Sequence, residues 1–359
     1  MRNTKRWLAC AFVPVLALLG ASTLPATATA APDTGSLIAP IGTDTEVTFE
    51  SEGLTLFGSL RTPEHPVAGT AALLLPGSGP TDRNGNQPGI TADTLARFAD
   101  ILAEHGIPSL RFDKLGSGAT GLGDLAPEDI GDYGFTDQVD HAAAAASLLR
   151  DRTGVDADGL LVLGHSEGAL TALALVDRGV TSAGIGLLQP LPIRYLDLLD
   201  AQISTQLDGA VAGGQLPAGE ADAVRADLDR TVESLRATGT VPADVHPMLA
   251  QLGLNEANAK FLSEADSLDP SILAAGLDES ASVLLTCSDK DLNVSCAQVE
   301  PLRNALAHTE LEFHRFATAS HQLKELGPVP PSSLDIFAPL PMSAEFSTAL
   351  NEWAAFHGR

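Results

Sequence analysis

The stretch Leu160-Leu-Val-Leu-Gly-His-Ser-Glu-Gly-Ala-Leu170 carries the clearest structural signal in this chain. Its first four residues are apolar and predict a buried strand, and the Ala/Leu-rich sequence that continues to Val176 predicts a helix. Between them lies Gly-x-Ser-x-Gly around Ser166, the pattern of a strained turn that lifts a serine hydroxyl clear of a sheet. The glycines let strand and helix approach without Cβ contacts, and the helix N-terminus offers N–H groups to a developing oxyanion. We therefore expect a nucleophile elbow with Ser166 at its tip.

The first thirty residues have the pattern of a secretory signal peptide. A basic start with Arg2, Lys5 and Arg6 precedes an apolar run from residue 7 to 20, and Ala28-Thr-Ala30 follows. The run is too short to span a bilayer. Cys10 allows a lipoprotein alternative, but it begins the apolar run that a lipidated cysteine should end. We expect cleavage after Ala30, secretion, and no membrane anchor after cleavage.

The charge balance limits the classes of partner. The 359 residues include 46 acidic and only 21 basic side chains, which gives a formal net charge of −25 at pH 7. Loss of residues 1–30 would make the charge more negative still. Nucleic acid and anionic membrane surfaces are therefore excluded as expected partners. The remaining chain is long enough to bury a large core in one or two domains.

Two of the three cysteines, Cys287 and Cys296, lie beyond the predicted signal peptide. Two cysteines nine positions apart in an exported protein form a disulfide more often than two free thiols. A metal site is disfavoured because neither a Cys-x-x-Cys motif nor a pair of histidines accompanies them. We expect this disulfide, and neither a metal nor a cofactor.

Strand and helix patterns alternate along most of the chain. The patterns predict a hairpin at 46–61, strands at 71–75, 109–112, 160–163, 183–188, 282–286 and 311–316, and helices at 91–105, 138–149 and 344–356. In the last helix, Phe346, Leu350, Trp353 and Phe356 have the spacing of core residues. The alternation predicts an α/β fold with a doubly wound, mostly parallel sheet covered on both faces.

The alternation stops between residues 193 and 277, where the composition is helical and no strand pattern occurs. The economical interpretation is one core, 31–192 and 278–359, with residues 193–277 inserted late in the chain as a helical cap. The alternative is a separate C-terminal domain from Ile193, which would leave the last two strands without a sheet. Residues 328–341 are proline-rich and predict an extended surface loop.

The partners that Ser166 would need follow two later strands. A serine hydroxyl requires a base, and the base requires an anion that fixes its tautomer. Loops at the carboxyl ends of parallel strands meet at one edge of a sheet. Asp289 and Asp291 follow the strand at 282–286, and His321 follows the strand at 311–316. Along the chain, the candidate residues therefore occur in the order serine, aspartate, histidine, and either aspartate could be the acid.

With these residues in place, the chain resembles the α/β-hydrolase superfamily, close to secreted bacterial serine esterases and serine-aminopeptidase-like hydrolases. The resemblance covers 46–188 and 282–358. Besides the elbow, it rests on Pro76-Gly-Ser-Gly-Pro-Thr-Asp-Arg-Asn-Gly85, Arg111-Phe-Asp-Lys-Leu-Gly-Ser-Gly118 and Ser288-Asp-Lys-Asp-Leu-Asn-Val294. It implies that Asp291 is the triad acid in preference to Asp289, and that His321 is the base.

The resemblance also implies an oxyanion hole. Relatives usually carry His-Gly after the first parallel strand, where this chain has Pro76-Gly77. The relevant donor is the backbone N–H of the next residue, so Ser78 and Glu167 are the expected donors. Leu115 replaces an arginine that is frequent in such proteins, in a loop expected to be structural.

Several nearby polar residues have less specific interpretations. For Asp82 and Arg83, an ion pair with each other on the surface is favoured over contact with substrate. His165 is expected to pack beside the serine, and His308 and His314 are expected to be structural or surface histidines.

The expected function is hydrolysis of a small-molecule carboxylic ester through an acyl-enzyme on Ser166. One alternative is peptide or amide hydrolysis, with acidic residues of the insertion such as Asp197, Asp200 and Glu220 binding the peptide amine. Another is a binding protein that keeps an inactive hydrolase fold. The acyl-chain length, the alcohol group and the oligomeric state do not follow from the sequence.

Overall fold

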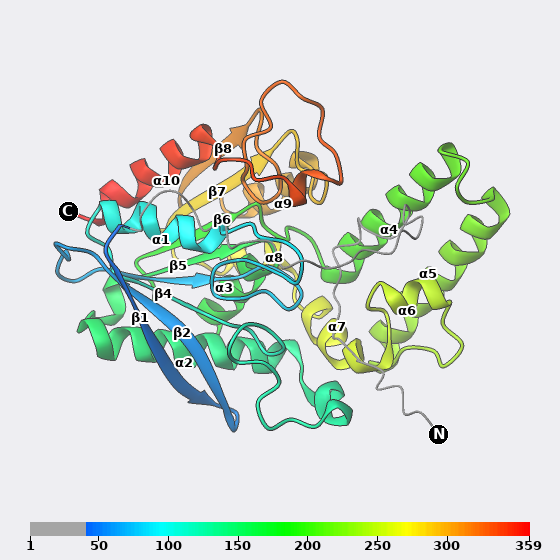
Figure 1. Cartoon of the computed structure of the whole chain (residues 1–359), viewed down its shortest axis with the longest axis horizontal. Helices are drawn as coiled ribbons and strands as arrows, with labels where there is room; N and C mark the ends of the chain where they lie inside the picture. Colours follow the sequence, from blue (N-terminus) through cyan, green and yellow to red (C-terminus); the bar gives the residue numbers. More distant parts are fainter. Residues whose placement is uncertain (1–40) are drawn as a thin grey trace, which may run out of the picture.

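The computed structural model describes residues 41–359, so the predicted signal peptide and Cys10 lie outside the described residues. A single sheet forms the centre of the molecule, with helices on both faces and a group of helices beyond one edge of the core (Figure 1). Among the described residues, no helix combines the length and apolar character needed to cross a bilayer.

The sheet has eight strands in the order β1-β2-β4-β3-β5-β6-β7-β8. The strands are β1 (Thr43–Ser51), β2 (Leu54–Thr62), β3 (Ala71–Leu75), β4 (Ser109–Phe112), β5 (Leu160–His165), β6 (Gly184–Leu188), β7 (Ser282–Ser288) and β8 (Glu310–Phe316). β1 and β2 form an antiparallel hairpin, and β2 also pairs antiparallel with β4. All other neighbours are parallel, as predicted for a mostly parallel, doubly wound sheet.

Burial explains why the inner strands read as continuous apolar runs. Every residue of β3, β5, β6 and β7 is buried, whereas β1 and β8, at the two edges, alternate or stay partly exposed. A parallel strand covered by helices on both faces needs apolar side chains in both directions. Successive side chains of β5 accordingly point into two different cores: Leu160 and Val162 into one, and Leu161 and Leu163 into the other.

Two layers of helices cover the sheet. α1 (Thr94–Glu104) and α10 (Ala344–His357) pack on one face through Leu95, Phe98, Phe346 and Trp353. α2 (Phe135–Thr153), α3 (Glu167–Asp177) and α9 (Cys296–Ala305) contribute to the core on the other face. The expected core position of Phe356 is wrong, because 58% of this residue is exposed. The next residue, His357, contacts the sheet instead, with its Nε2 3.1 Å from Ser282 Oγ of β7.

Between β6 and β7 the described chain is helical. The helices are α4 (Tyr195–Ala212), α5 (Ala218–Thr238), α6 (Pro247–Gln251), α7 (Ala259–Asp266) and α8 (Pro270–Ala275). Short 3₁₀ turns lie at Pro127–Asp132, Ala157–Gly159, Glu256–Asn258 and Asp335–Phe337. α4, α5 and α6 extend away from the sheet (Figure 1). The base of this group is anchored on α2, where the ring of Phe261 meets that of Phe135 at 5.6 Å.

The close approach of α3 to the sheet positions the turn between β5 and α3. A Cβ on Gly168 would lie 2.3 Å from the carbonyl oxygen of Leu75 and 2.7 Å from that of Pro76. A Cβ on Gly164 would lie 2.0 Å from the carbonyl oxygen of Gly168. Both glycines of the Gly-x-Ser-x-Gly motif are therefore required by packing between backbones, which no side-chain rearrangement can relieve.

We predict that Gly168→Ala lowers the free energy of unfolding by about 1–3 kcal/mol or more, because the new methyl group overlaps backbone atoms of β3. Gly209→Ala is the matched control: Gly209 lies within α4 with nothing within 4 Å of its added Cβ. Alanine there should raise stability by up to about 1 kcal/mol. Urea unfolding followed by circular dichroism measures both values. Equal stability of the two variants would contradict the packing account.

Candidate active site

Ser166 lies between the end of β5 and the first residue of α3, with φ 56° and ψ −120°. A positive φ is costly for a residue with a Cβ, and here the surrounding backbone enforces it. The Ser166 N–H donates to the carbonyl of Leu188 in β6, and the Ser166 carbonyl accepts from the N–H of Leu191, both at 3.0 Å. These bonds and the flanking glycines hold Ser166 at the carboxyl edge of the parallel strands.

His321 contacts the serine from the loop that follows β8. Its Nε2 lies 3.0 Å from Ser166 Oγ, and its Nδ1 lies 2.8 Å from Asp291 Oδ2. The side chains of His321 and Asp291 are 9% and 1% exposed. The carboxylate only accepts, so Nδ1 carries the proton and Nε2 is free to accept one from the serine.

Asp291, and not Asp289, points at His321. The second oxygen of Asp291, Oδ1, accepts from the backbone N–H groups of Asn293 at 2.7 Å and Val294 at 2.9 Å, which fix the carboxylate. Asp289 instead pairs with Arg315 on β8 at 2.7 Å, where both side chains are exposed. The geometry thus brings together Ser166, Asp291 and His321.

The backbone N–H groups of Ser78 and Glu167 flank Ser166. Ser78 follows β3, and Glu167 is the first residue of α3. Within residues 41–359 neither N–H donates to another protein group. Both residues line the same cavity as the serine. Their N–H groups are therefore available to an oxygen atom placed beside Ser166.

The cavity in front of Ser166 has a volume of about 540 Å³. Its walls are Ser78, Gln87, Leu191, Leu292, Asn293, Ser295 and Gln298 from the core, and Tyr195, Leu198, Leu199, Ala201, Gln202, Thr205 and Gln206 from α4. A smaller pocket of about 70 Å³ extends from Ser166 toward Ile90, Ala92 and Leu95. The described residues contain no group of three or more His, Cys, Asp or Glu side chains arranged to hold a metal ion.

Comparison with solved structures gives the fold independently. An esterase of Pyrococcus furiosus matches 78% of this chain and 83% of its own, with a TM-score of 0.50 and 16% sequence identity. The protein Est1E of Butyrivibrio proteoclasticus (87% and 98% covered, TM-score 0.51, 13% identity) and a 2,6-dihydroxy-pseudo-oxynicotine hydrolase (87% and 67%, 0.51, 13%) also match. The chain has the α/β-hydrolase fold. No family model and no curated protein sequence matches it.

In this α/β-hydrolase fold, His165 supports the histidine loop. Burial lowers the pKa of His165 to about 4, and the neighbouring His321 acts in the same direction. The neutral ring donates from Nε2 to the carbonyl oxygen of His321 at 2.8 Å. His165 therefore packs beside the serine, as expected, and also holds the backbone of His321. His308 contacts the carbonyls of Ala305 and Leu277, and His314 contacts Glu312 and the ring of Phe316. Neither lines the cavity.

The expected ion pair between Asp82 and Arg83 does not form. Arg83 pairs with the buried carboxylate of Asp113 at 2.7 Å and donates to the Gly58 carbonyl at 2.8 Å. Asp82 accepts from backbone N–H groups of its own loop. The expected partners, Asp82 and Arg83, are adjacent in sequence. The partner that Arg83 has in the structure, Asp113, lies thirty positions away on the loop after β4. Neither residue lines the cavity.

Sequence reasoning missed a buried ion pair beside the backbone N–H groups of Ser78 and Glu167. Lys114 Nζ lies 2.7 Å from Glu167 Oε1 and 3.1 Å from the carbonyl oxygen of Gly77. Glu167 also accepts from Tyr195 of α4 at 2.8 Å and from Gln138 of α2 at 3.0 Å. The available signal was a lysine two positions after a buried strand, inside a motif on which the resemblance already rests.

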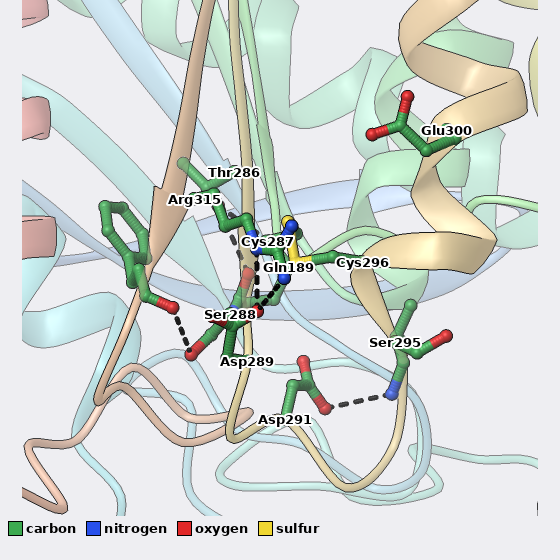
Figure 2. The surroundings of a disulfide bond; sticks show 12 residues. Gln189, Thr286, Cys287, Ser288, Asp289, Asp291, Ser295, Cys296, Glu300 and Arg315 are labelled. Atoms are coloured by element: carbon green, nitrogen blue, oxygen red, sulfur yellow. Dashed lines mark hydrogen bonds and ion pairs between the residues drawn. A yellow bond between two sulfur atoms is a disulfide. The ribbon is translucent and has the colours of Figure 1, made fainter.

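The predicted disulfide is present. Cys287 of β7 and Cys296, the first residue of α9, are joined with their Cα atoms 5.4 Å apart, and the loop that they enclose carries Asp289 and Asp291 (Figure 2). Ser295 caps α9 in a reciprocal arrangement with Gln298. The bond thus ties both ends of the loop that carries Asp289 and Asp291 to regular structure.

We predict that replacing both cysteines by serine lowers the free energy of unfolding by about 2–3 kcal/mol, the chain-entropy value for so short a loop. Mass spectrometry of the native protein should find no free thiol at Cys287 or Cys296, and chemical denaturation of the two proteins gives the difference in stability. Free thiols in natively folded protein, or equal stability of the variant, would refute this prediction.

Proposed function

We propose that this protein is a serine hydrolase that cleaves neutral carboxylic esters through an acyl-enzyme on Ser166. The observation that carries the proposal is the continuous hydrogen-bonded chain from Ser166 through His321 to Asp291, opening onto a cavity beside two unused backbone N–H groups. A nucleophile, a base, an orienting anion and oxyanion donors are the parts that acyl transfer requires.

The chemistry follows from these positions. His321 Nε2 accepts the hydroxyl proton as Ser166 Oγ bonds to the ester carbon, and Asp291 stabilises the resulting imidazolium. The N–H groups of Ser78 and Glu167 receive the negative carbonyl oxygen. His321 then returns the proton to the departing alkoxide, leaving an ester on Ser166. A water molecule, activated by the same histidine, releases the carboxylic acid and restores the hydroxyl.

The cavity lining supports a neutral substrate. Among the described residues, no lysine or arginine side chain lines it. The two carboxylates in its wall, Asp291 and Glu167, already have partners. The remaining lining consists of leucines, Ala201, amides, hydroxyls and the imidazole of His321. An anionic substrate would therefore find no counter-charge and would approach a strongly acidic protein.

Amide hydrolysis of the aminopeptidase type has less support. A peptide amine needs an acidic partner near the scissile bond, and the three candidates of the insertion are elsewhere. Asp197 pairs with Arg236, Asp200 accepts from Ser204, and Glu220 is exposed on α5. None of the three lines the cavity. The filled triad in turn argues against an inactive binding protein.

We propose that residues 193–277 act as a cap through α4. This helix supplies seven of the residues that line the cavity, including Tyr195, Gln202 and Gln206. Caps of this kind limit substrate size and the access of water. Export from the cell is part of the same proposal: a disulfide in the acid loop suits an oxidising compartment.

We predict that Ser166→Ala reduces ester hydrolysis at least about 10⁴-fold while leaving the melting temperature unchanged, because only the nucleophilic oxygen is lost. The wild-type protein should react with a fluorophosphonate probe, and the variant should not. p-Nitrophenyl esters should be cleaved, and aminoacyl anilides should be cleaved poorly or not at all. A variant with more than about a tenth of wild-type activity would refute the nucleophile.

We also predict that Asp291→Asn lowers kcat about 10⁴-fold, since an amide at this position holds the imidazole in the wrong tautomer. Asp289→Asn is the matched control in the same loop. It removes a surface pair with Arg315 and should leave kcat nearly unchanged. Steady-state kinetics of both variants tests this prediction. A lower kcat in Asp289→Asn than in Asp291→Asn would transfer the acid role to Asp289.

A further inference from the structure

We propose that Lys114 is a positioning residue that, through its ion pair with Glu167, aims both oxyanion donors at the reacting oxygen. The proposal rests on the proposed function, since it assigns a support to the N–H groups of Ser78 and Glu167. Lys114 contacts neither the serine nor the histidine. It acts on one donor through the carbonyl of Gly77 and on the other through the carboxylate of Glu167.

The first donor belongs to the peptide bond between Gly77 and Ser78. Lys114 Nζ lies 3.1 Å from the oxygen of this peptide. The described chain has no cis peptide, so the N–H of Ser78 points in the direction opposite to the bonded oxygen. By holding the oxygen on one side, Lys114 aims the N–H to the other side. The ammonium also polarises the peptide, which makes the N–H a stronger donor.

The second donor is the backbone N–H of Glu167 itself. Its carboxylate is held at both oxygens: Oε1 accepts from Lys114 and Gln138, and Oε2 accepts from Tyr195. The side chain of Glu167 is 1% exposed and that of Lys114 is 8% exposed. A side chain fixed in this way restrains the first turn of α3, and with it the direction of the Glu167 N–H.

Stability alone does not account for this pair. Burying an ammonium and a carboxylate costs desolvation energy that their attraction often only balances, so a buried pair is weak evidence of a stabilising role. This pair instead connects the loop after β3, the loop after β4 and the first turn of α3. Those are the segments whose relative positions set the spacing of the two donors.

Tyr195 brings the proposed cap into the same network. Burial raises the pKa of Tyr195, and the nearby charge of Glu167 adds to the effect, so its hydroxyl stays protonated and donates. Tyr195 is the first residue of α4, the helix that forms one wall of the cavity. The oxyanion donors are therefore connected through Glu167 to the wall that faces the substrate.

The test is the double variant Lys114→Met/Glu167→Gln, which removes both charges together and leaves neither one buried alone. We expect kcat for a p-nitrophenyl ester to fall by about 10- to 100-fold. This is no more than the fall in kcat that removal of a whole oxyanion donor causes. KM should change little, because the ground-state ester depends less on these donors. Affinity for a trifluoromethyl ketone, whose adduct with Ser166 is tetrahedral, should fall by the same factor as kcat/KM.

Arg61→Met is the control for loss of a buried ion pair. Arg61 pairs with Asp44 and Asp100 away from the cavity, so this variant should lower the melting temperature and keep kcat. Tyr195→Phe provides a second route should the double variant not fold. It removes one bond to Glu167, and we expect kcat to fall several-fold with KM unchanged.

Two further results separate the possibilities. The downfield proton resonance of His321 Nδ1 should persist in the variants, which shows that the triad is intact. A folded double variant with wild-type kcat and wild-type ketone affinity overturns the positioning role, and so does wild-type kcat in Tyr195→Phe if only that variant folds. Full activity in Ser166→Ala would instead overturn the proposed function.

Discussion

The site around Ser166 depends on one constraint, the close contact between the backbone of α3 at Gly168 and the backbone at the end of β3. Gly168 lies against the carbonyls of Leu75 and Pro76, so helix α3 sits closer to β3 than any side chain would permit. That approach places the first residue of the helix beside the loop after β3. It also forces Ser166 into a positive φ. The N–H groups of Ser78 and Glu167 become neighbours as a direct result.

Buried ion pairs are a second constraint on the structure, although the chain has few basic residues. Arg61, Arg83, Arg111 and Lys114 all have side chains that are at most 12% exposed, and each contacts a carboxylate. Arg83 and Asp113 hold the loop after β3 to the loop after β4, and the Asp113 carboxylate fills the space where a Cβ of Gly118 would stand. Arg83 therefore fixes these two loops to each other, whereas Lys114 connects the loop after β4 to the first residue of α3.

The sequence predicted the parts that depend on local pattern. Fully buried strands such as β5 appear as apolar runs, and the parallel sheet brings Ser166, Asp291 and His321 to one edge in the expected order. Pairings between distant loops were missed, because nothing in the spacing of Arg83 and Asp113, or of Lys114 and Glu167, distinguishes these partners from nearer charges. Phe356 has helical core spacing but is exposed, because the next residue of α10, His357, takes the position against β7.

The place where the helices α4 to α8 interrupt the core has a consequence for how this architecture can vary. β6 and β7 are direct neighbours, so the chain leaves the sheet at Leu188 and returns at Ser282 to the adjacent position. The entropy of closing such a loop grows only with the logarithm of its length, about 0.6 kcal/mol for each doubling. By loop-closure entropy alone, insertions and deletions here therefore cost the sheet little. The length of the helical segment between β6 and β7 can therefore vary while the edge that carries Ser166, Asp291 and His321 stays the same.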